Sequence, residues 1–234
     1  MGITSESILG YLQPSSFIDY PGQISAVLFL PGCNLRCPYC HNHDLLIRPY
    51  PEGRITWEEL SNFLDKRKKV LSGVTISGGE PSMYPDLKEL IHLIKDKGYL
   101  VKLDTNGCYP SKLDNIDVDY IALDIKTTQQ KQKLMGLSEN YDYYDLLQQS
   151  IDKIKHQNIF LEMRSVIVPP LLEDDDIREL IPFIRQSDQY YFTKFRPGKC
   201  LSRDYGIHNV PSVEMMKKVE MILSDYNISF KIRA

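Results

Sequence analysis

The sequence predicts an α/β protein whose strands form an incomplete TIM-type βα barrel. Apolar, β-branched runs alternate with amphipathic stretches along nearly the whole chain, the pattern expected of repeated strand and helix units. Such alternation gives a mainly parallel sheet with right-handed crossovers. Several of the runs carry ionisable side chains on one face only, whereas strands covered on both faces are apolar throughout. A barrel lumen that holds a charged ligand explains that polar face, and a solvated sheet face is the alternative interpretation.

The expected elements follow one another in regular order. Seven strands are predicted from their apolar and β-branched runs: 24–30, 73–77, 99–104, 120–124, 159–168, 190–195 and 228–232. Five amphipathic helices are predicted between them: 56–70, 85–97, 143–156, 174–185 and 212–224. Thr56 is expected to cap the first helix, because Glu59 follows three residues later. Residues 1–22 form a short N-terminal segment before the barrel, and 1–234 is expected to be a single domain.

The polar face recurs on three consecutive strands. The side chains that share it are Leu100, Lys102 and Asp104 on the first, Tyr120, Ala122, Asp124 and Lys126 on the second, and Glu162 and Arg164 on the third. The opposite faces of these strands are apolar. The predicted lumen therefore contains both carboxylates and cations.

Composition and charge restrict the possible partners. The formal net charge is -3 and the pI is about 6.0, which does not provide the basic surface that nucleic acid binding needs. No apolar stretch approaches the roughly 20 residues of a membrane-spanning helix. The N-terminus lacks the basic and apolar regions of a signal peptide. We therefore expect a cytoplasmic protein that binds neither nucleic acid nor membrane.

Five cysteines are present, and Cys33, Cys37 and Cys40 lie close together in a loop directly after the first predicted strand. A disulfide scaffold would use an even number of cysteines spread through a small secreted chain. The cluster therefore predicts a metal site or a redox site at the carboxyl end of a barrel strand, where βα barrels place their chemistry. Cys108 and Cys200 are expected to be small buried apolar side chains.

Four interpretations of the cysteine loop remain open on the residues alone. A thioredoxin-like dithiol of Cys37 and Cys40 leaves Cys33 without a role. Covalent haem at the C-x-x-C-H sequence that ends in His41 implies export. Structural zinc would use the three cysteines and His41, crowded into one short loop. An iron–sulfur cluster with three thiolates leaves its fourth iron open to a ligand.

The loop resembles the signature of the radical S-adenosylmethionine (SAM) enzymes, C-x3-C-x2-C with an aromatic residue, here Tyr39, before the last cysteine. This resemblance implies one [4Fe-4S] cluster whose open iron is chelated by the amino and carboxylate groups of SAM. Gly78, Gly79 and Glu80 follow the second strand and resemble the GGEP motif of this family, whose backbone approaches the SAM amino group. Glycine is expected there because a side chain would block the approach.

The strand ends offer further candidates. Asp104 and Asp124 would repel each other beside a bound SAM carboxylate unless a cation lay between them. Lys126 is one candidate for that cation, and a monovalent metal ion held by Asp104, Thr105 and Asp124 is the other. The adjoining Asn-Gly dipeptide is expected to form only a turn.

Arg164 on the next strand is expected to meet the ribose or carboxylate of SAM, as the resemblance implies, or to form a lumen ion pair with Glu162. A histidine stacks on adenine in some related enzymes, and His208 is only a candidate for that position.

Among radical SAM enzymes, the chain is most similar to the activating enzymes of glycyl-radical proteins. The segments that carry this similarity are 17–22, 29–34, 39–42, 103–107, 122–126 and 194–198. The closest resemblance is to activators of anaerobic (class III) ribonucleotide reductase, and activators of pyruvate formate-lyase look less similar at the N-terminal segment. The resemblance implies a glycyl-radical protein as substrate and a flavodoxin- or ferredoxin-type electron donor. The alternatives are a small-molecule radical SAM enzyme, such as the ring contraction to 7-carboxy-7-deazaguanine, and a non-catalytic zinc or redox module.

Overall fold

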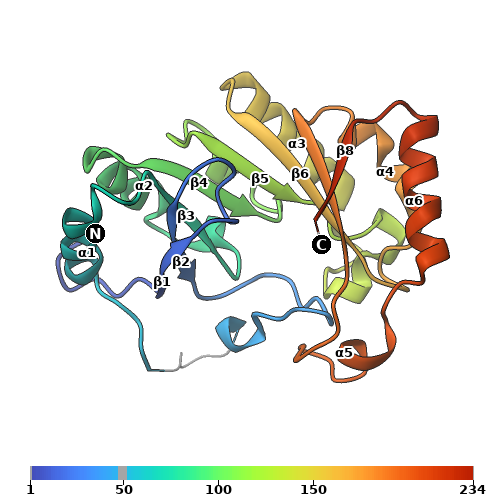
Figure 1. Ribbon diagram of the computed structural model, residues 1–234, viewed down its shortest axis with the longest axis horizontal. Coiled ribbons are helices and arrows are strands. Elements are labelled where there is room, and N and C mark those ends of the chain that lie inside the picture. Colours follow the sequence, from blue (N-terminus) through green and yellow to red (C-terminus); the bar gives the residue numbers. More distant parts are fainter. Residues whose placement is uncertain (1, 47–51, 234) are drawn as a thin grey trace.

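The computed structural model describes residues 2–46 and 52–233, so that positions 1, 47–51 and 234 of the predicted single domain lie outside the described residues. The strands form one sheet in which neighbours in space are neighbours in sequence (Figure 1). Its strands are β1 (Tyr11–Ser16), β2 (Ser25–Leu30), β3 (Gly73–Gly78), β4 (Leu100–Thr105), β5 (Tyr120–Asp124), β6 (Phe160–Ile167), β7 (Gln189–Lys194) and β8 (Phe230–Arg233). All seven predicted strands are present, with ends that differ by a few residues.

An additional strand, β1, lies in the segment that we expected to precede the barrel. It pairs antiparallel with β2, whereas each successive pair of strands from β2 to β8 is parallel. In the described part of the chain, β1 and β8 are the two edges of the sheet and do not pair with each other. The barrel is therefore incomplete, as predicted. Pro14 within β1 is tolerated because this strand lies at an edge, where no inner ladder bond is lost.

The predicted helices form between the strands. They are α1 (Trp57–Arg67), α2 (Leu87–Asp96), α3 (Tyr143–His156), α4 (Asp176–Ile184) and α6 (Val213–Asp225), and a short α5 (Tyr205–His208) was not predicted. Thr56 caps α1 in a capping box, because its hydroxyl accepts from Glu59 N and the Glu59 carboxylate accepts from Thr56 N. The described helices include none that is long and apolar enough to span a membrane.

The two faces of the sheet differ as the alternation predicts. Side chains such as Val101, Ile121 and Leu161 are fully buried in the apolar core. Lys102 and Glu162 on the opposite face are also completely buried. The interpretation of that face as a solvated surface is therefore wrong, and the polar side chains lie inside the lumen.

Candidate active site

The cysteine loop, residues 31–42, follows β2 and is held from both sides by other segments. On one side Arg36 N donates to Met135 O at 2.7 Å, from the 3-10 helix Gln129–Met135. On the other side Leu201 N donates to Cys40 O at 3.1 Å, in the segment between β7 and α5. The loop thus has a backbone fixed by segments more than 90 residues away in sequence.

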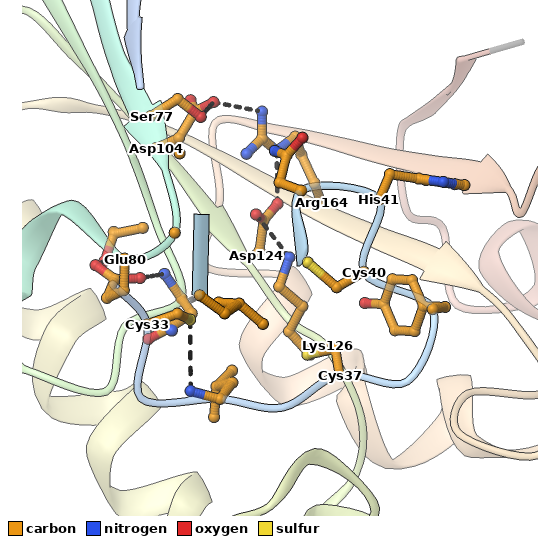
Figure 2. Close-up of a pocket in the computed structure, with 18 residues that line it drawn as sticks. Cys33, Cys37, Cys40, His41, Ser77, Glu80, Asp104, Asp124, Lys126 and Arg164 are labelled. Atoms are coloured by element: carbon orange, nitrogen blue, oxygen red, sulfur yellow. Dashed lines mark hydrogen bonds and ion pairs between the residues drawn. The ribbon is translucent and has the colours of Figure 1, made fainter. Parts of the chain in front are cut away.

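Cys33, Cys37 and Cys40 all line one pocket at the carboxyl ends of the strands (Figure 2). None of the three is in a disulfide. Burial raises the pKa of Cys33 to about 11 and that of Cys37 to about 12, and the charge of Lys126 partly opposes both shifts. Burial also raises the pKa of Cys40. Burial thus favours the neutral form of the three thiols, whereas coordination to a metal would favour the thiolate.

A single zinc ion does not suit this arrangement. In the described residues, no group of three or more His, Cys, Asp or Glu side chains is arranged to hold a single metal ion. The fourth expected ligand, His41, stacks on Phe195 at 5.6 Å and its Nδ1 lies 3.1 Å from Lys199 O. Three thiols in one pocket suit a cluster in which each thiolate takes a different iron.

The glycines after β3 pack directly against the cysteine loop. A Cβ at Gly79 would lie 2.1 Å from Gly32 O, and one at Gly78 would lie 2.4 Å from Leu30 O. Gly78 also has a φ of +120°, which favours glycine. Contact with neighbouring backbone therefore already requires glycine at both positions, in addition to the approach of SAM that we expected.

The variant Gly79→Ala is expected to lose about 3 kcal/mol of stability and most of its iron, because the new methyl group must push the backbone that carries Cys33. Thermal unfolding and iron content after anaerobic reconstitution measure these losses. Gly198→Ala is the matched control, since its Cβ would meet nothing closer than His41 Cε1 at 3.5 Å. Equal behaviour of the two variants would contradict the packing argument.

Glu80 joins the glycine loop to the end of β4. Its buried carboxylate accepts hydrogen bonds from Thr105 Oγ1 at 2.7 Å, Asn106 N at 2.7 Å and Ser82 N at 2.9 Å. Burial raises the pKa of Glu80 despite these donors. Asn106, expected only to turn the chain, also bonds Asn34 of the cysteine loop through its side chain at 2.8 Å. Glu80 therefore holds two strand ends in place around the pocket.

Asp104 and Asp124 lie at the carboxyl ends of neighbouring strands, and Arg164 lies between their carboxylates (Figure 2). Arg164 contacts both, with Nε 2.7 Å from Asp124 Oδ1 and Nη1 3.4 Å from Asp104 Oδ2. Lys126 Nζ lies 2.9 Å from Asp124 Oδ2, and Lys102 pairs with Asp104. Three side chains therefore supply the positive charge that we expected from Lys126 or a metal ion.

The shifted pKa values follow from this pairing. Burial would raise the pKa of Asp104 and Asp124, but the charge of Arg164, with Lys102 or Lys126, outweighs it and holds both below their usual value. Burial likewise would lower the pKa of Lys126 and Arg164, but their carboxylate partners raise it well above the usual value. These four groups are consequently charged at neutral pH.

Glu162 and Arg233 form a second layer of the lumen beneath Arg164. Glu162 Oε2 accepts from Tyr120 OH at 2.6 Å and from Arg233 Nη2 at 2.9 Å, and Glu162 Oε1 lies 3.9 Å from Arg164 Nε. The expected ion pair with Arg164 is thus the weaker contact of Glu162. The sequence analysis did not identify Arg233 as a lumen residue. The available signal was alternation along β8, which places Arg233 and Lys231 on one face of the strand.

The pocket contains a buried polar atom that lacks a partner in the described residues. Tyr39 is 7% exposed, its ring packs edge-on against Phe195 at 6.1 Å, and its hydroxyl makes no hydrogen bond. His41 lines the pocket, whereas His208 is exposed at the end of α5 and is not among the lining residues. Soft thiols, an unpaired hydroxyl and paired charges together fit an iron–sulfur cluster beside a zwitterionic cosubstrate.

Comparisons with known proteins agree with this site. The radical SAM superfamily pattern matches residues 27–184. A Methanocaldococcus jannaschii protein named as a glycyl-radical enzyme activating enzyme is 31% identical over 225 residues, which cover 93% of this chain and 92% of that protein. The pyruvate formate-lyase-activating enzyme of Clostridium pasteurianum is 28% identical over 232 residues, which cover 92% of this chain and 95% of that enzyme.

Solved structures show the same fold at low sequence identity. A radical SAM methyltransferase from Sphaerobacter thermophilus gives a TM-score of 0.68 at 16% identity, covering 94% of this chain and 68% of that one. Streptococcus suis SuiB bound to S-adenosylmethionine gives a TM-score of 0.64 at 16% identity, covering 86% of this chain. The chain spans about half of SuiB, because the match covers 48% of the SuiB chain.

The chain belongs to the radical SAM superfamily, an enzyme class that uses a [4Fe-4S] cluster and SAM. Within that class it belongs to the glycyl-radical enzyme activating enzymes. The interpretation as a non-catalytic zinc or redox module is therefore wrong.

Proposed function

We propose that this chain cleaves SAM reductively and generates a glycyl radical on a partner protein. The observation that carries the proposal is the single pocket in which three thiols lie beside paired carboxylates and cations at the strand ends. Once reduced by a flavodoxin- or ferredoxin-type donor, a bound [4Fe-4S] cluster would supply the one electron needed to divide SAM into methionine and a 5′-deoxyadenosyl radical. That radical would take a hydrogen atom from the Cα of one glycine of the partner, giving 5′-deoxyadenosine and the glycyl radical.

In this proposal the residues of the chain hold and orient the two cofactors. Cys33, Cys37 and Cys40 would bind three irons of the cluster. Lys126 and Arg164, which both pair with Asp124, would meet the carboxylate and ribose of SAM. Asp104, together with Thr105, completes the wall of the site.

The remaining contacts come from the backbone and from Tyr39. The backbone of Gly78 and Gly79 would meet the SAM amino group, and Glu80 keeps that backbone in place through Thr105 and Asn106. The unpaired Tyr39 hydroxyl lies in the same pocket and is available to the cosubstrate. A site pre-organised in this way excludes water and positions SAM for cleavage.

The test is anaerobic reconstitution followed by dithionite and SAM. Formation of 5′-deoxyadenosine is the expected result. A protein that takes up no iron, or holds iron but leaves SAM intact, would disprove the proposal.

We propose anaerobic ribonucleotide reductase as the partner, on the resemblance of the segments before and after the first barrel strand. Pyruvate formate-lyase is the second candidate, because a relative whose alignment covers 92% of this chain is named as its activating enzyme. Electron paramagnetic resonance of each candidate, incubated with the chain, SAM and a reduced flavodoxin- or ferredoxin-type donor, decides between them. A glycyl radical in the reductase alone supports the first assignment, and one in the lyase alone overturns it.

A further inference from the structure

Glu162 is a fully buried carboxylate that does not itself line the pocket. It lies two residues before Arg164 on β6, so its side chain points into the lumen one layer beneath the pocket. Removing a carboxylate from water is costly unless its charge is compensated. Arg233 compensates it at 2.9 Å, and Arg233 comes from the edge strand β8.

Counted as formal charges, the Asp, Glu, Lys and Arg side chains that line the pocket or pair in the layer beneath it comprise as many cations as carboxylates. The cations are Lys102, Lys126, Arg164 and Arg233, and the carboxylates are Glu80, Asp104, Asp124 and Glu162. Because the interior screens charge poorly, loss of one of these charges is felt throughout the lumen. SAM brings an additional positive charge, its sulfonium, into this region.

We propose that Glu162 is a positioning and specificity-determining residue that favours the sulfonium of SAM over an uncharged sulfur. Its carboxylate offsets the positive charges of Arg164 and Arg233, so the lumen admits another cation without net repulsion. The inference rests on the proposed use of this pocket for SAM. Its consequence concerns the choice between SAM and S-adenosylhomocysteine, which shares the adenosine, amino and carboxylate groups but lacks the sulfonium charge.

The measurement is the dissociation constant of each ligand for the anaerobically reconstituted protein, determined by calorimetry without reductant. In Glu162→Gln the shape is retained and one negative charge is lost, so SAM affinity is expected to fall about fivefold relative to S-adenosylhomocysteine. Arg233→Gln removes a positive charge from the same ion pair. Its ratio of affinities is expected to move in the opposite direction, toward SAM.

Two controls separate charge from structure. Tyr120→Phe deletes a hydrogen bond of 2.6 Å to Glu162 but keeps the carboxylate, so the affinity ratio is expected to stay at the wild-type value. Glu214→Gln makes the same charge change on the exposed first turn of α6 and is also expected to leave the ratio unchanged.

A purely structural role would change both affinities together. If Glu162→Gln and Arg233→Gln leave the ratio at its wild-type value, or shift it in the same direction, the inference is overturned. If Glu162→Gln does not fold, Arg233→Gln alone decides through the sign of its shift. Formation of 5′-deoxyadenosine by the wild-type protein tests the proposed function separately, so failure of one does not imply failure of the other.

Discussion

Replacing Cys33, Cys37 or Cys40 by alanine is expected to abolish SAM cleavage. Each variant removes one of three thiols from a single pocket, and in the described residues no fourth cysteine lines that pocket. Mutation of a residue that only supports a metal ligand typically lowers metal affinity or activity about 10- to 100-fold. We therefore expect replacement of a ligand itself to lower the rate of SAM cleavage by more than about a hundredfold. Iron content and 5′-deoxyadenosine formation after anaerobic reconstitution are the measurements.

Cys108→Ala and Cys200→Ala are the matched controls. Both residues are buried, 7% and 6% exposed, and neither lines the pocket. Burial raises the pKa of Cys108 to about 12, although a hydrogen bond from Asn34 partly lowers it. Iron content and activity within about twofold of wild type are expected for these small substitutions. Loss of the cluster in either control would mean that the three-thiol assignment is wrong.

Arg164→Met is expected to be the second severe change, because it leaves Asp104 and Asp124 close together with less compensation. Breaking a buried ion pair typically lowers the free energy of unfolding by about 3 to 5 kcal/mol. Because the Arg164 side chain is 20% exposed, we expect a decrease near the lower limit, about 3 kcal/mol at neutral pH. Chemical denaturation at a series of pH values measures it. Arg164→Lys keeps the charge and should lose less.

The sign of the pH dependence follows from the lowered pKa of both carboxyl groups. Their pairing with Arg164 stabilises the native state above the ordinary aspartate pKa of about 4 and is lost as the pH falls through the lower native values. The difference between wild type and Arg164→Met should therefore be largest at neutral pH and shrink in acid. A difference that stays constant with pH would indicate lost packing rather than lost charge.

The sequence predicted the succession of strands and helices along the chain and the polarity of the lumen, because each depends on local patterns. Alternation along β4, β5 and β6 placed Lys102, Asp124 and Glu162 on one face, and the structure confirms that all three face the lumen. Thr56 and Glu59 likewise form a local capping box that needs no tertiary contact. Helix ends agree to within a few residues for the same reason.

Strand β1 was missed because nothing in its own sequence indicates a strand. Its residues, YLQPSS, include a proline and lack alternation, so the pairing with β2 decides its conformation. The short α5 is similar, since its four residues are held against the cysteine loop by the preceding segment, through Ser202 N and Pro38 O at 2.9 Å.

By itself the sequence determined the identity of the thiols, the glycines and the acids at the strand ends, because motif spacing and period-two alternation are properties of consecutive residues. Only the tertiary structure decided which charges meet. Arg164 shares two carboxylates from different strands, and Arg233 reaches Glu162 across 71 positions. Ion pairing depends on distances in space, and parallel strands bring together residues that no local pattern relates.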